Sequence, residues 1–207
     1  MLRVLLAALL ASAIAGAAEN TLAPQEKKDG WMLLFNGHNL HGWDGDPALW
    51  SVKNGVIAGS TDSHPLKHNE FLISTQKYAD FILQADIKLR NHNSGIQFRS
   101  EVLPEWVCKG YQADAAEGDW WGSLYEERGR GVLVNGWKGK GETVVHADGW
   151  NHYEITAHGH HIQLKLNGMV TVDLDDPNGA LDGVIALQMH AGKPMEVEFR
   201  NIKIKKL

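Results

Sequence analysis

The chain has 207 residues with 25 acidic and 20 basic side chains, which gives a formal net charge of −5 at pH 7. Acids and bases are interspersed and form no basic stripe, so nucleic acid is excluded as an expected partner. The only cysteine is Cys108, which excludes an internal disulfide and leaves burial as the source of stability. No local motif supports a catalytic thiol there, and we expect a buried structural residue.

The N-terminus has the features of a secretory signal peptide. Arg3 provides a basic start, residues 4–14 form an apolar run, and small residues follow at 15–18. We predict a signal peptide over residues 1–18, cleaved near Ala17 or Ala18, and export to the periplasm or the medium. The apolar run is too short to span a bilayer, and no later stretch is long enough, so no membrane span is expected.

Residues 19–30 are polar and contain Pro24, which predicts a flexible leader before one domain over residues 31–207. From Trp31 onward, short runs of β-forming residues alternate with Gly, Asn and Asp turn signals. No window of eleven or more residues has a helical repeat of apolar positions. The expected strands are 32–35, 50–53, 56–58, 71–74, 81–89, 95–99, 110–114, 124–125, 132–133, 142–145, 151–158, 161–166, 169–173, 184–190 and 196–205.

Many short strands at close spacing predict an all-β sandwich or barrel. The clearest hairpin covers residues 151–166, where apolar side chains alternate, and Asn167-Gly168 then turns into another strand. Two antiparallel sheets packed face to face are the simplest arrangement.

Three of these strands place unusual polar residues on one face. Extended backbone sends alternate side chains to opposite faces, so each of the following sets shares a face. The sets are Gln97 with Arg99 and Glu101, Gln112 with Asp114, and Ala186 with Gln188 and His190. Amide, guanidinium and imidazole groups make directional hydrogen bonds, which favours a binding surface. An ordinary solvated sheet face is the alternative.

The segment 109–130 (KGYQADAAEGDWWGSLYEERGR) adds aromatic residues to this picture. Trp120, Trp121 and Tyr125 follow Gln112 and Asp114 closely, and flat apolar surface beside polar groups suits a sugar-sized ligand. A surface loop whose aromatic rings cap the core would give the same composition.

An ordered set of short motifs resembles the 3-keto-disaccharide hydrolase domain family. The motifs are LFNG at 34–37, Leu40, GW at 42–43, NSGIQFR at 93–99, GYQAD at 110–114, WGSLYEE at 121–127, IALQMH at 185–190 and FRNI at 199–202. Together they cover about 31–207. The resemblance implies a concanavalin A-like jelly roll, in which two curved antiparallel sheets hold carbohydrate on the concave face.

The resemblance also implies a reaction on an oxidised (3-keto) sugar or glycoside. A ketone at C3 acidifies the C2 proton, so a base can remove it and the glycosidic oxygen can leave C1 by elimination. Water then adds to the unsaturated sugar, which completes net hydrolysis. The route needs a base, an acid for the leaving oxygen and hydrogen bonds to the enolate.

The residue roles carried over from the resemblance are hypotheses. His190 or Asp114 is the base and Tyr125 the acid, while Arg99 and Gln112 hold the ketone or enolate oxygen and Trp121 flanks the ring. The other substrate-binding positions are Gln97, Glu127 and Gln188. Ala115-Ala116-Glu117 departs from the family pattern, which expects glycine and a bulky residue there, so the geometry of this loop is open. A histidine bonded within the sheet is the alternative for His190.

Other readings of the sequence stay open. A non-catalytic carbohydrate-binding module of the same fold would use Trp120, Trp121 and Trp137 as stacking platforms. A retaining glycosidase would need two acids alternating on one inner strand, and we find no such strand. No cofactor is required by the sequence, although Asp114 or Glu127 could hold a divalent cation. The histidines at 158, 160 and 161 are interpreted as a solvated hairpin tip.

Overall fold

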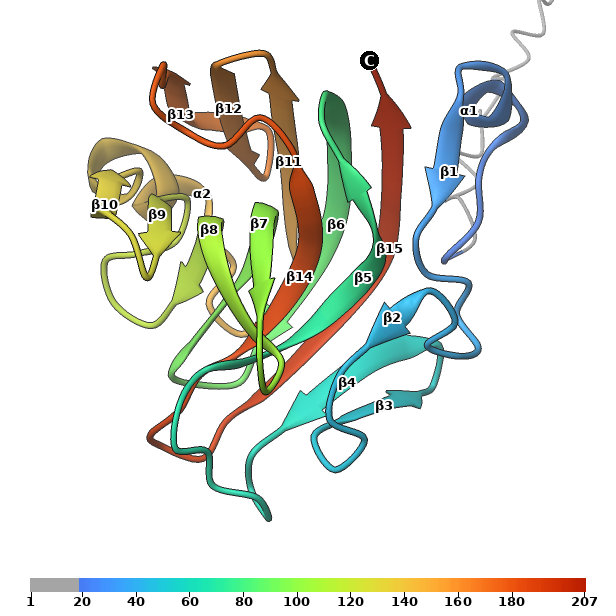
Figure 1. Cartoon of the computed structure of the whole chain (residues 1–207), viewed down its shortest axis with the longest axis vertical. Helices are drawn as coiled ribbons and strands as arrows, with labels where there is room; N and C mark the ends of the chain where they lie inside the picture. The colour runs from blue at the N-terminus through green and yellow to red at the C-terminus, as the bar shows by residue number, and fades with distance from the viewer. Residues whose placement is uncertain (1–18) are drawn as a thin grey trace, which may run out of the picture.

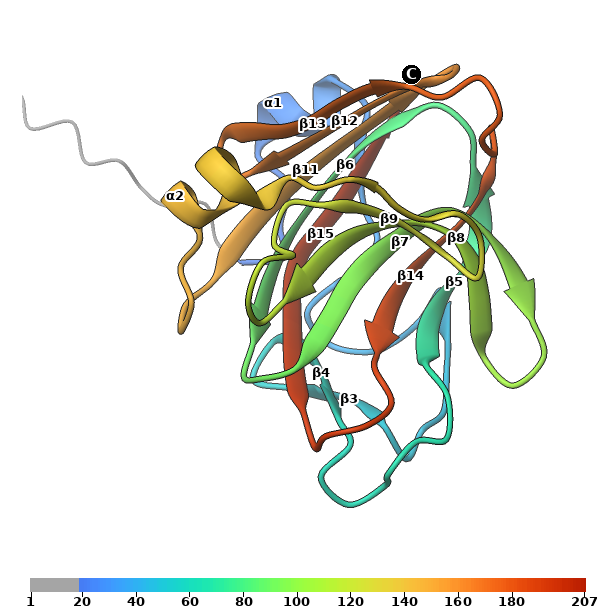
Figure 2. The same ribbon diagram turned by 90° about the vertical axis from the view of Figure 1, so that its left-hand side faces the viewer.

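The computed structural model describes residues 19–207, in which two antiparallel β-sheets lie face to face (Figures 1 and 2). This confirms the predicted all-β, two-sheet jelly-roll sandwich. The predicted signal peptide falls on residues 1–18, outside the described part of the chain. Within residues 19–207, no helix is both long and apolar enough to cross a membrane.

The first sheet has eight strands. Its order is β13-β12-β11-β6-β15-β4-β3, and β1 pairs with β15 beside this path. The strands are β1 (Trp31–Leu33), β3 (Trp50–Lys53), β4 (Val56–Ser60), β6 (Phe81–Leu89), β11 (Asn151–His158), β12 (His161–Leu166), β13 (Met169–Asp175) and β15 (Glu196–Lys206). The predicted hairpin over 151–166 is present, with Tyr153 opposite Leu166 and His158 opposite His161.

The second sheet has seven strands in the order β10-β9-β8-β7-β14-β5-β2. The strands are β2 (Trp43–Asp44), β5 (Glu70–Tyr78), β7 (Asn93–Leu103), β8 (Val107–Ala116), β9 (Leu124–Glu127), β10 (Gly131–Val134) and β14 (Gly183–Met189). The central strands β8, β7 and β14 come from distant parts of the sequence and carry the three polar sets predicted above.

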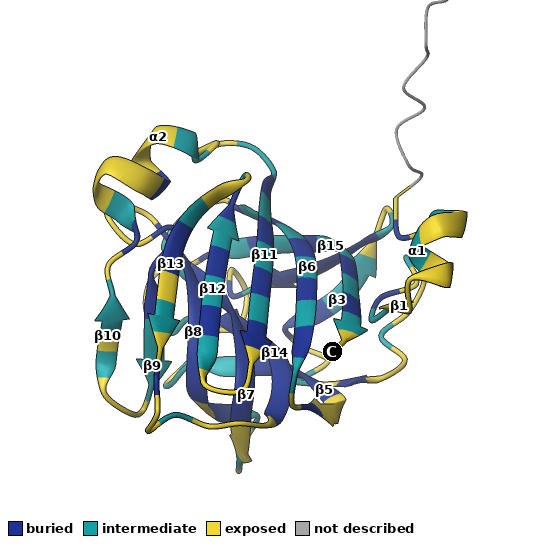
Figure 3. Ribbon diagram, turned by 90° about the horizontal axis from the view of Figure 1, so that it is seen from above, coloured by how far each residue is buried: buried dark blue, intermediate teal, exposed yellow. Residues whose placement is uncertain are grey.

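The core fills the space between the two sheets. In β6 and β11 every second residue is buried, which Figure 3 shows as alternating dark and lighter bands. Phe81 and Tyr153 of the eight-stranded sheet meet Phe98 and Leu187 of the seven-stranded sheet in one apolar cluster. Phe81 contacts the edge of Phe98, with ring centroids 6.3 Å apart. Since these side chains occupy the inner faces, the polar sets of β8 and β14, together with Gln97 of β7, lie on the outer face of the seven-stranded sheet.

Two segments differ from the prediction. The expected flexible leader contains a short helix, α1 (Pro24–Lys28), and is tied to β15 because Asn20 and Asn201 exchange backbone-to-side-chain hydrogen bonds. The expected strand over 142–145 is wrong. This segment follows a turn over Trp137–Gly141, in which Lys138 and Gly139 have non-helical backbone angles, and forms the helical turn α2 (Glu142–Val144).

The glycines of the segment 137–144 allow the chain to approach the β8–β9 connection closely. A Cβ on Gly141 would lie 2.3 Å from the carbonyl oxygen of Trp121. The carboxylate of Glu142 also accepts a hydrogen bond from the backbone N–H of Gly139, at 2.5 Å, which closes the turn.

Candidate active site

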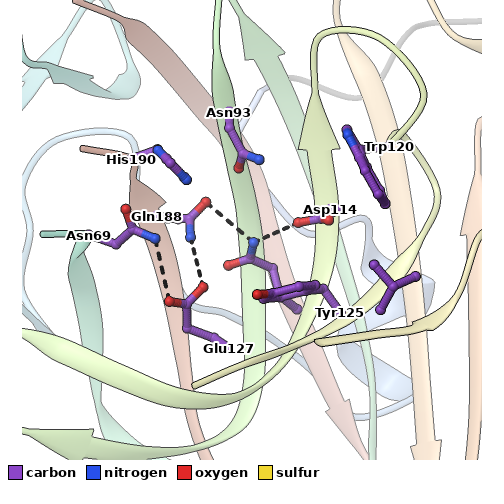
Figure 4. A pocket seen from close by; sticks show the side chains of 10 residues that line it. Asn69, Asn93, Asp114, Trp120, Tyr125, Glu127, Gln188 and His190 are labelled. Carbon is purple, nitrogen blue, oxygen red and sulfur yellow. Dashed lines mark hydrogen bonds between the residues drawn. The ribbon is translucent and has the colours of Figure 1, made fainter. Parts of the chain in front are cut away.

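A cavity of about 250 Å³ opens on the outer face of the seven-stranded sheet (Figure 4). Its walls come from β7, β8, β9, β10 and β14, from the β8–β9 connection, and from the residues that precede β5 and follow β14. The lining residues are Asn69, Asn93, Gln112, Asp114, Trp120, Tyr125, Glu127, Val132, Gln188 and His190. The three residues predicted as catalytic, His190, Asp114 and Tyr125, therefore lie around one pocket, together with Gln112, Glu127 and Gln188 from the predicted binding set.

A chain of amide hydrogen bonds joins the two carboxyl groups of the pocket. Gln112 Nε2 donates to Asp114 Oδ1 at 2.7 Å and to Gln188 Oε1 at 3.3 Å. Gln188 Nε2 then donates to Glu127 Oε2 at 3.5 Å, and Asn69 Nδ2 to the other Glu127 oxygen at 3.4 Å. Both glutamines lie between Asp114 and Glu127, and both carboxylates receive N–H groups from neutral side chains.

Asp114 is the most perturbed acid in the pocket. Its side chain is almost fully buried on β8, and its backbone carbonyl accepts a hydrogen bond from the hydroxyl of Tyr153 in the facing sheet. Burial raises the pKa of Asp114 to about 7, the hydrogen bond from Gln112 opposes this rise, and the charge of Glu127 adds to it. A carboxyl group with this pKa is partly protonated at neutral pH, so it can give or take a proton there.

The pKa values of Glu127 and Tyr125 are also raised. For Glu127 burial is the main cause, while the hydrogen bond from Asn69 and the charge of Arg128 act in the opposite direction. For Tyr125 burial raises the pKa first, and the nearby charges of Glu127 and Asp114 raise it further. The Tyr125 hydroxyl therefore keeps its proton at neutral pH and can donate a hydrogen bond into the pocket.

His190 follows the end of β14, and its ring faces the cavity opposite Asp114 (Figure 4). Its Nδ1 lies 2.6 Å from the carbonyl oxygen of Ala191. A carbonyl oxygen only accepts hydrogen bonds, so Nδ1 carries the proton and a neutral His190 has a free electron pair on Nε2. Burial lowers the pKa of His190, the bond to Ala191 raises it, and the nearby His92 lowers it again, with a net lowering. His190 is therefore mostly neutral at pH 7 and can act as a base.

The aromatic wall of the pocket is Trp120, whereas Trp121 was predicted to flank the ligand. Trp120 is 38% exposed and lines the cavity. Trp121 is buried in the core and stacks on Tyr153, with the ring planes 9° apart. Neighbouring residues of the β8–β9 connection point to opposite sides, so only one of the two indole rings can reach the pocket. Trp137, the third proposed platform, packs against the core instead.

Arg99 does not reach the pocket, which corrects its predicted role at the ketone or enolate oxygen. β7 has a bulge between Phe98 and Glu101, and Arg99 adopts a left-handed conformation with φ 48°. Its buried guanidinium binds Asp80 at 2.8 Å and donates to the backbone carbonyls of Ala79 and Gly159. These contacts leave Arg99 a structural role at the far end of the strand.

Gln97 lies beneath the pocket and does not line it. It is fully buried, donates to Gln112 Oε1 at 3.3 Å and accepts a hydrogen bond from the Ser100 hydroxyl at 2.5 Å. Gln97 therefore orients Gln112 and does not itself face a ligand in the cavity. Gly95 gives Gln112 its space, because a Cβ on Gly95 would lie 2.7 Å from Gln112 Cγ.

Asn69, Asn93 and Val132 line the pocket although the sequence reasoning assigned them no role. Asn69 precedes β5, and its side chain also accepts a hydrogen bond from the backbone N–H of Ala191. The Oδ1 atom of Asn93 is buried and has no hydrogen-bond partner within residues 19–207. Asn93 opens the NSGIQFR motif, so that motif was the available signal. For Asn69 and Val132 no local pattern pointed to the pocket.

The histidines at 158, 160 and 161, predicted to form a solvated turn, lie at the β11–β12 hairpin of the eight-stranded sheet, whereas the pocket is on the seven-stranded sheet. His161 is partly exposed and contacts Asp173 and Asp175 of the neighbouring strand β13. Across residues 19–207, no group of three or more His, Cys, Asp or Glu side chains is placed to hold a metal ion.

Cys108 is buried, and burial raises the pKa of its thiol to about 12, with the charge of Glu127 as a second cause.

Solved structures of low sequence identity share this fold. Two glycosyl hydrolase-like proteins of Parabacteroides distasonis align with TM-scores of 0.69 and 0.65, at 22% and 26% identity. They cover 92% and 86% of this chain and 100% and 99% of their own. The carbohydrate-binding module CBM66 of Bacillus subtilis aligns with a TM-score of 0.62 at 16% identity, covering 80% of this chain and 96% of its own.

No curated protein matches the chain. A family model does match, described as a 3-keto-alpha-glucoside-1,2-lyase-like domain, and it covers residues 30–205. This range includes every β-strand named above except the last residue of β15. The match confirms the resemblance seen in the sequence motifs, and the chain belongs to the 3-keto-alpha-glucoside-1,2-lyase-like domain family.

Proposed function

We propose that this protein is an exported enzyme that cleaves the glycosidic bond of 3-keto-glycosides by elimination followed by hydration. The observation that carries this proposal is the placement of a neutral imidazole, His190, opposite a carboxyl group of pKa about 7, Asp114, in one pocket. The membership in a 3-keto-alpha-glucoside-1,2-lyase-like family supports the choice of an oxidised sugar as substrate.

In the first step His190 acts as the base. Its Nε2 takes the C2 proton of the sugar, and the electrons of the C2–H bond move toward the C3 ketone to form an enolate. The side-chain amides of Asn69 and Gln188, each with one N–H group not used in the chain of hydrogen bonds, and the hydroxyl of Tyr125 are the donors available to the enolate oxygen, while Gln112 uses both of its N–H groups on Asp114 and Gln188.

In the second step the enolate collapses, a C1–C2 double bond forms and the C1–O bond breaks. The leaving oxygen needs a proton, and the protonated fraction of Asp114 supplies it from the other side of the pocket, with Tyr125 as a second donor. Water then adds to C1, the Asp114 carboxylate takes up the proton that this water loses, and His190 returns a proton to C2. The net change is hydrolysis, with no oxidation or reduction.

The apolar wall fits a sugar ring. Trp120 offers an exposed indole face, and Val132 lies beside it in the lining of the pocket. Flat apolar surface next to amide groups is the usual way in which proteins bind a hexose. The volume of about 250 Å³ suits one sugar unit, and the remainder of a glycoside would extend out of the opening.

A carbohydrate-binding module of the same fold is the second candidate, and the similarity to CBM66 together with the exposed Trp120 favours it. Binding alone requires no buried carboxyl group opposite a histidine. A retaining glycosidase is less well supported, because Gln112 and Gln188 separate Asp114 from Glu127. On the backbone, Glu127 lies opposite Gly110, four residues along β8 from Asp114, about 13 Å at the usual strand rise.

The deciding experiment incubates the purified protein with an aryl 3-keto-glucoside and with the matched unoxidised glucoside. We expect release of the aglycone from the oxidised substrate only, both with and without a chelator. Binding of either sugar without release would favour the binding module, and release from the unoxidised glucoside would favour the glycosidase. Export is tested separately by N-terminal sequencing of the mature protein, with cleavage expected near Ala17 or Ala18.

A further inference from the structure

A second histidine, His92, meets His190 at a single backbone carbonyl. His92 lies in the β6–β7 connection, and its Nε2 is 3.1 Å from the carbonyl oxygen of Ala191, which is also 2.6 Å from His190 Nδ1. The two rings meet edge to face, with centroids 4.6 Å apart and planes at 73°. Neither the sequence motifs nor the lining of the pocket had indicated His92.

The backbone on both sides of this contact is unusual. His92 has φ 73°, a left-handed conformation that is uncommon for a residue with a side chain and that marks local strain. Gly192 has φ 122°, and a Cβ there would lie 3.0 Å from His92 Nε2. Both the backbone conformation and this short distance favour glycine at position 192, beside the His92 ring.

Several hydrogen bonds hold the two segments in this arrangement. The backbone N–H of Glu117 donates to the carbonyl of His92, and Asn91 Nδ2 donates to the carbonyl of Pro194 at 2.6 Å. The Ala191 N–H is bound by Asn69 Oδ1 at 3.0 Å. The backbone N–H and the backbone carbonyl of Ala191 are thus both held, and the carbonyl receives two imidazole N–H groups.

This geometry defines the tautomer of each ring. The shared carbonyl can only accept, so His190 carries its proton on Nδ1 and His92 carries its proton on Nε2. If the Ala191 carbonyl lost its second donor or moved, His190 could rotate or change tautomer, and Nε2 would then no longer present a free electron pair.

We propose that His92 is a positioning residue that holds the Ala191 carbonyl and the His190 ring so that Nε2 of His190 faces the pocket as a base. The catalytic part of this inference rests on the proposed function, whereas the tautomer and contact part does not. His92 itself does not line the cavity and is not proposed to touch the sugar.

Charge also acts between the two rings. Two protonated imidazoles at this distance repel each other, so a proton on His92 disfavours one on His190. The other ionisable groups that face His190 across the pocket are Asp114 on β8 and Tyr125 and Glu127 on β9, and Glu70 lies on the neighbouring strand β5. Removal of His92 takes away one cause of the lowered pKa of His190, so that pKa should rise.

The first test is ¹⁵N NMR of the imidazole nitrogens in the full chain, which needs no substrate. At neutral pH we expect His190 as the Nδ1–H tautomer and His92 as the Nε2–H tautomer. An Nε2–H signal for His190 in the unmodified protein would overturn the proposal, whatever the enzyme does.

The second test compares His92→Phe with His92→Gln. Phe keeps a ring and removes the donor, so we expect turnover of an aryl 3-keto-glucoside to fall about tenfold with little change in KM. Gln keeps an N–H donor without a charge and should recover most of this loss. In His92→Gln the acidic limb of the pH profile should move to higher pH, because His190 is protonated more readily.

His160→Phe is the matched control, because His160 Nδ1 also contacts a backbone carbonyl at 3.1 Å, that of Asp176, away from the pocket. We expect unchanged turnover and unchanged His190 signals in this variant. If His92→Phe leaves the tautomer and the pKa of His190 unchanged, the positioning role is refuted. If both change in a protein with no activity on any 3-keto-glycoside, the positioning role holds and the proposed function fails.

Discussion

The acidic residues on the outer faces of the two sheets have pKa values that are shifted in opposite directions. On the eight-stranded sheet, Glu154 accepts from Lys165 Nζ at 2.8 Å and Asp86 lies 2.7 Å from His152 Nδ1. Burial raises the pKa of both carboxyl groups, but these hydrogen bonds outweigh it and both pKa values lie below their usual range. On the seven-stranded sheet, Asp114 and Glu127 receive hydrogen bonds from side-chain amides, and both pKa values are raised.

The burial of the strands differs in the same way. Along β6, β11 and β12, buried residues alternate with partly exposed ones, as expected for a sheet with one wet face. Every residue of β14 is buried, although Gln188 is polar and lies on the outer face. Charges paired with opposite charges stabilise a fold, whereas buried carboxyls that lack a cation are typical of functional sites. The contrast therefore separates a structural face from a reactive one.

The largest expected effect concerns Arg99, the buried charge of the seven-stranded sheet that does have an acidic partner. Arg99→Ala removes the contact with Asp80 and leaves backbone carbonyls without a donor, so we expect a loss of about 3 kcal/mol in the free energy of unfolding. Urea unfolding measures this loss. KM for a 3-keto-glucoside should stay unchanged, and a raised KM would show that Arg99 takes part in substrate binding.

The next effect concerns catalysis. His190→Ala should lower turnover of a 3-keto-glucoside at least about a hundredfold, close to 2.7 kcal/mol, because the base is lost. His152→Ala on the eight-stranded sheet is the control, and its turnover should match that of the unmodified protein. Circular dichroism verifies that both variants are folded. Equal activity in all three proteins would remove His190 from the mechanism.

Replacing Asp114 and replacing Asp86 with a neutral residue should change the free energy of unfolding in opposite directions. The pKa of Asp114 is about 7 in the folded protein and about 3.9 in the unfolded chain, so its contribution to stability falls as the pH rises from about 4 to 7. Asp114→Asn should therefore stabilise the fold at neutral pH, on the order of 1–3 kcal/mol, while turnover falls about a hundredfold.

Asp86 has a lowered pKa, so its contribution is present above the unfolded pKa and is lost as the pH falls through the folded pKa. Asp86→Asn should destabilise the fold by about 1 kcal/mol at neutral pH and leave turnover unchanged. Urea unfolding of both variants between pH 4 and 8 tests the two signs. Destabilisation by Asp114→Asn at neutral pH would show that its carboxylate is well solvated or paired.

The smallest effect concerns the sugar contact. Trp120→Ala removes an exposed ring from the pocket wall and should raise KM or the dissociation constant of the sugar about tenfold, with little change in stability. Trp150→Ala is the matched control, because the Trp150 ring contacts Arg200 of the eight-stranded sheet, 4.0 Å from its guanidinium carbon. Equal ligand affinity in both variants would exclude Trp120 as the sugar platform.

The sequence by itself determined the fold class and the family, because both depend on local patterns. Alternation of side chains in β8 and β14 correctly placed Gln112 with Asp114 and Gln188 with His190, since a regular strand fixes which residues share a face. The pocket therefore contains most of the residues that the polar sets and the motifs had indicated.

Tertiary structure alone decided the rest. The bulge in β7 turned Arg99 away from the face that strict alternation assigns to it, and bulges depend on the register of partner strands. The β8–β9 connection places Trp120 in the pocket wall and Trp121 in the core. The approach of the β6–β7 connection to Ala191 brings His92 into contact with His190. Desolvation of Asp114 likewise arises from residues distant in the chain that enclose it, so its pKa could not be inferred from its sequence neighbours.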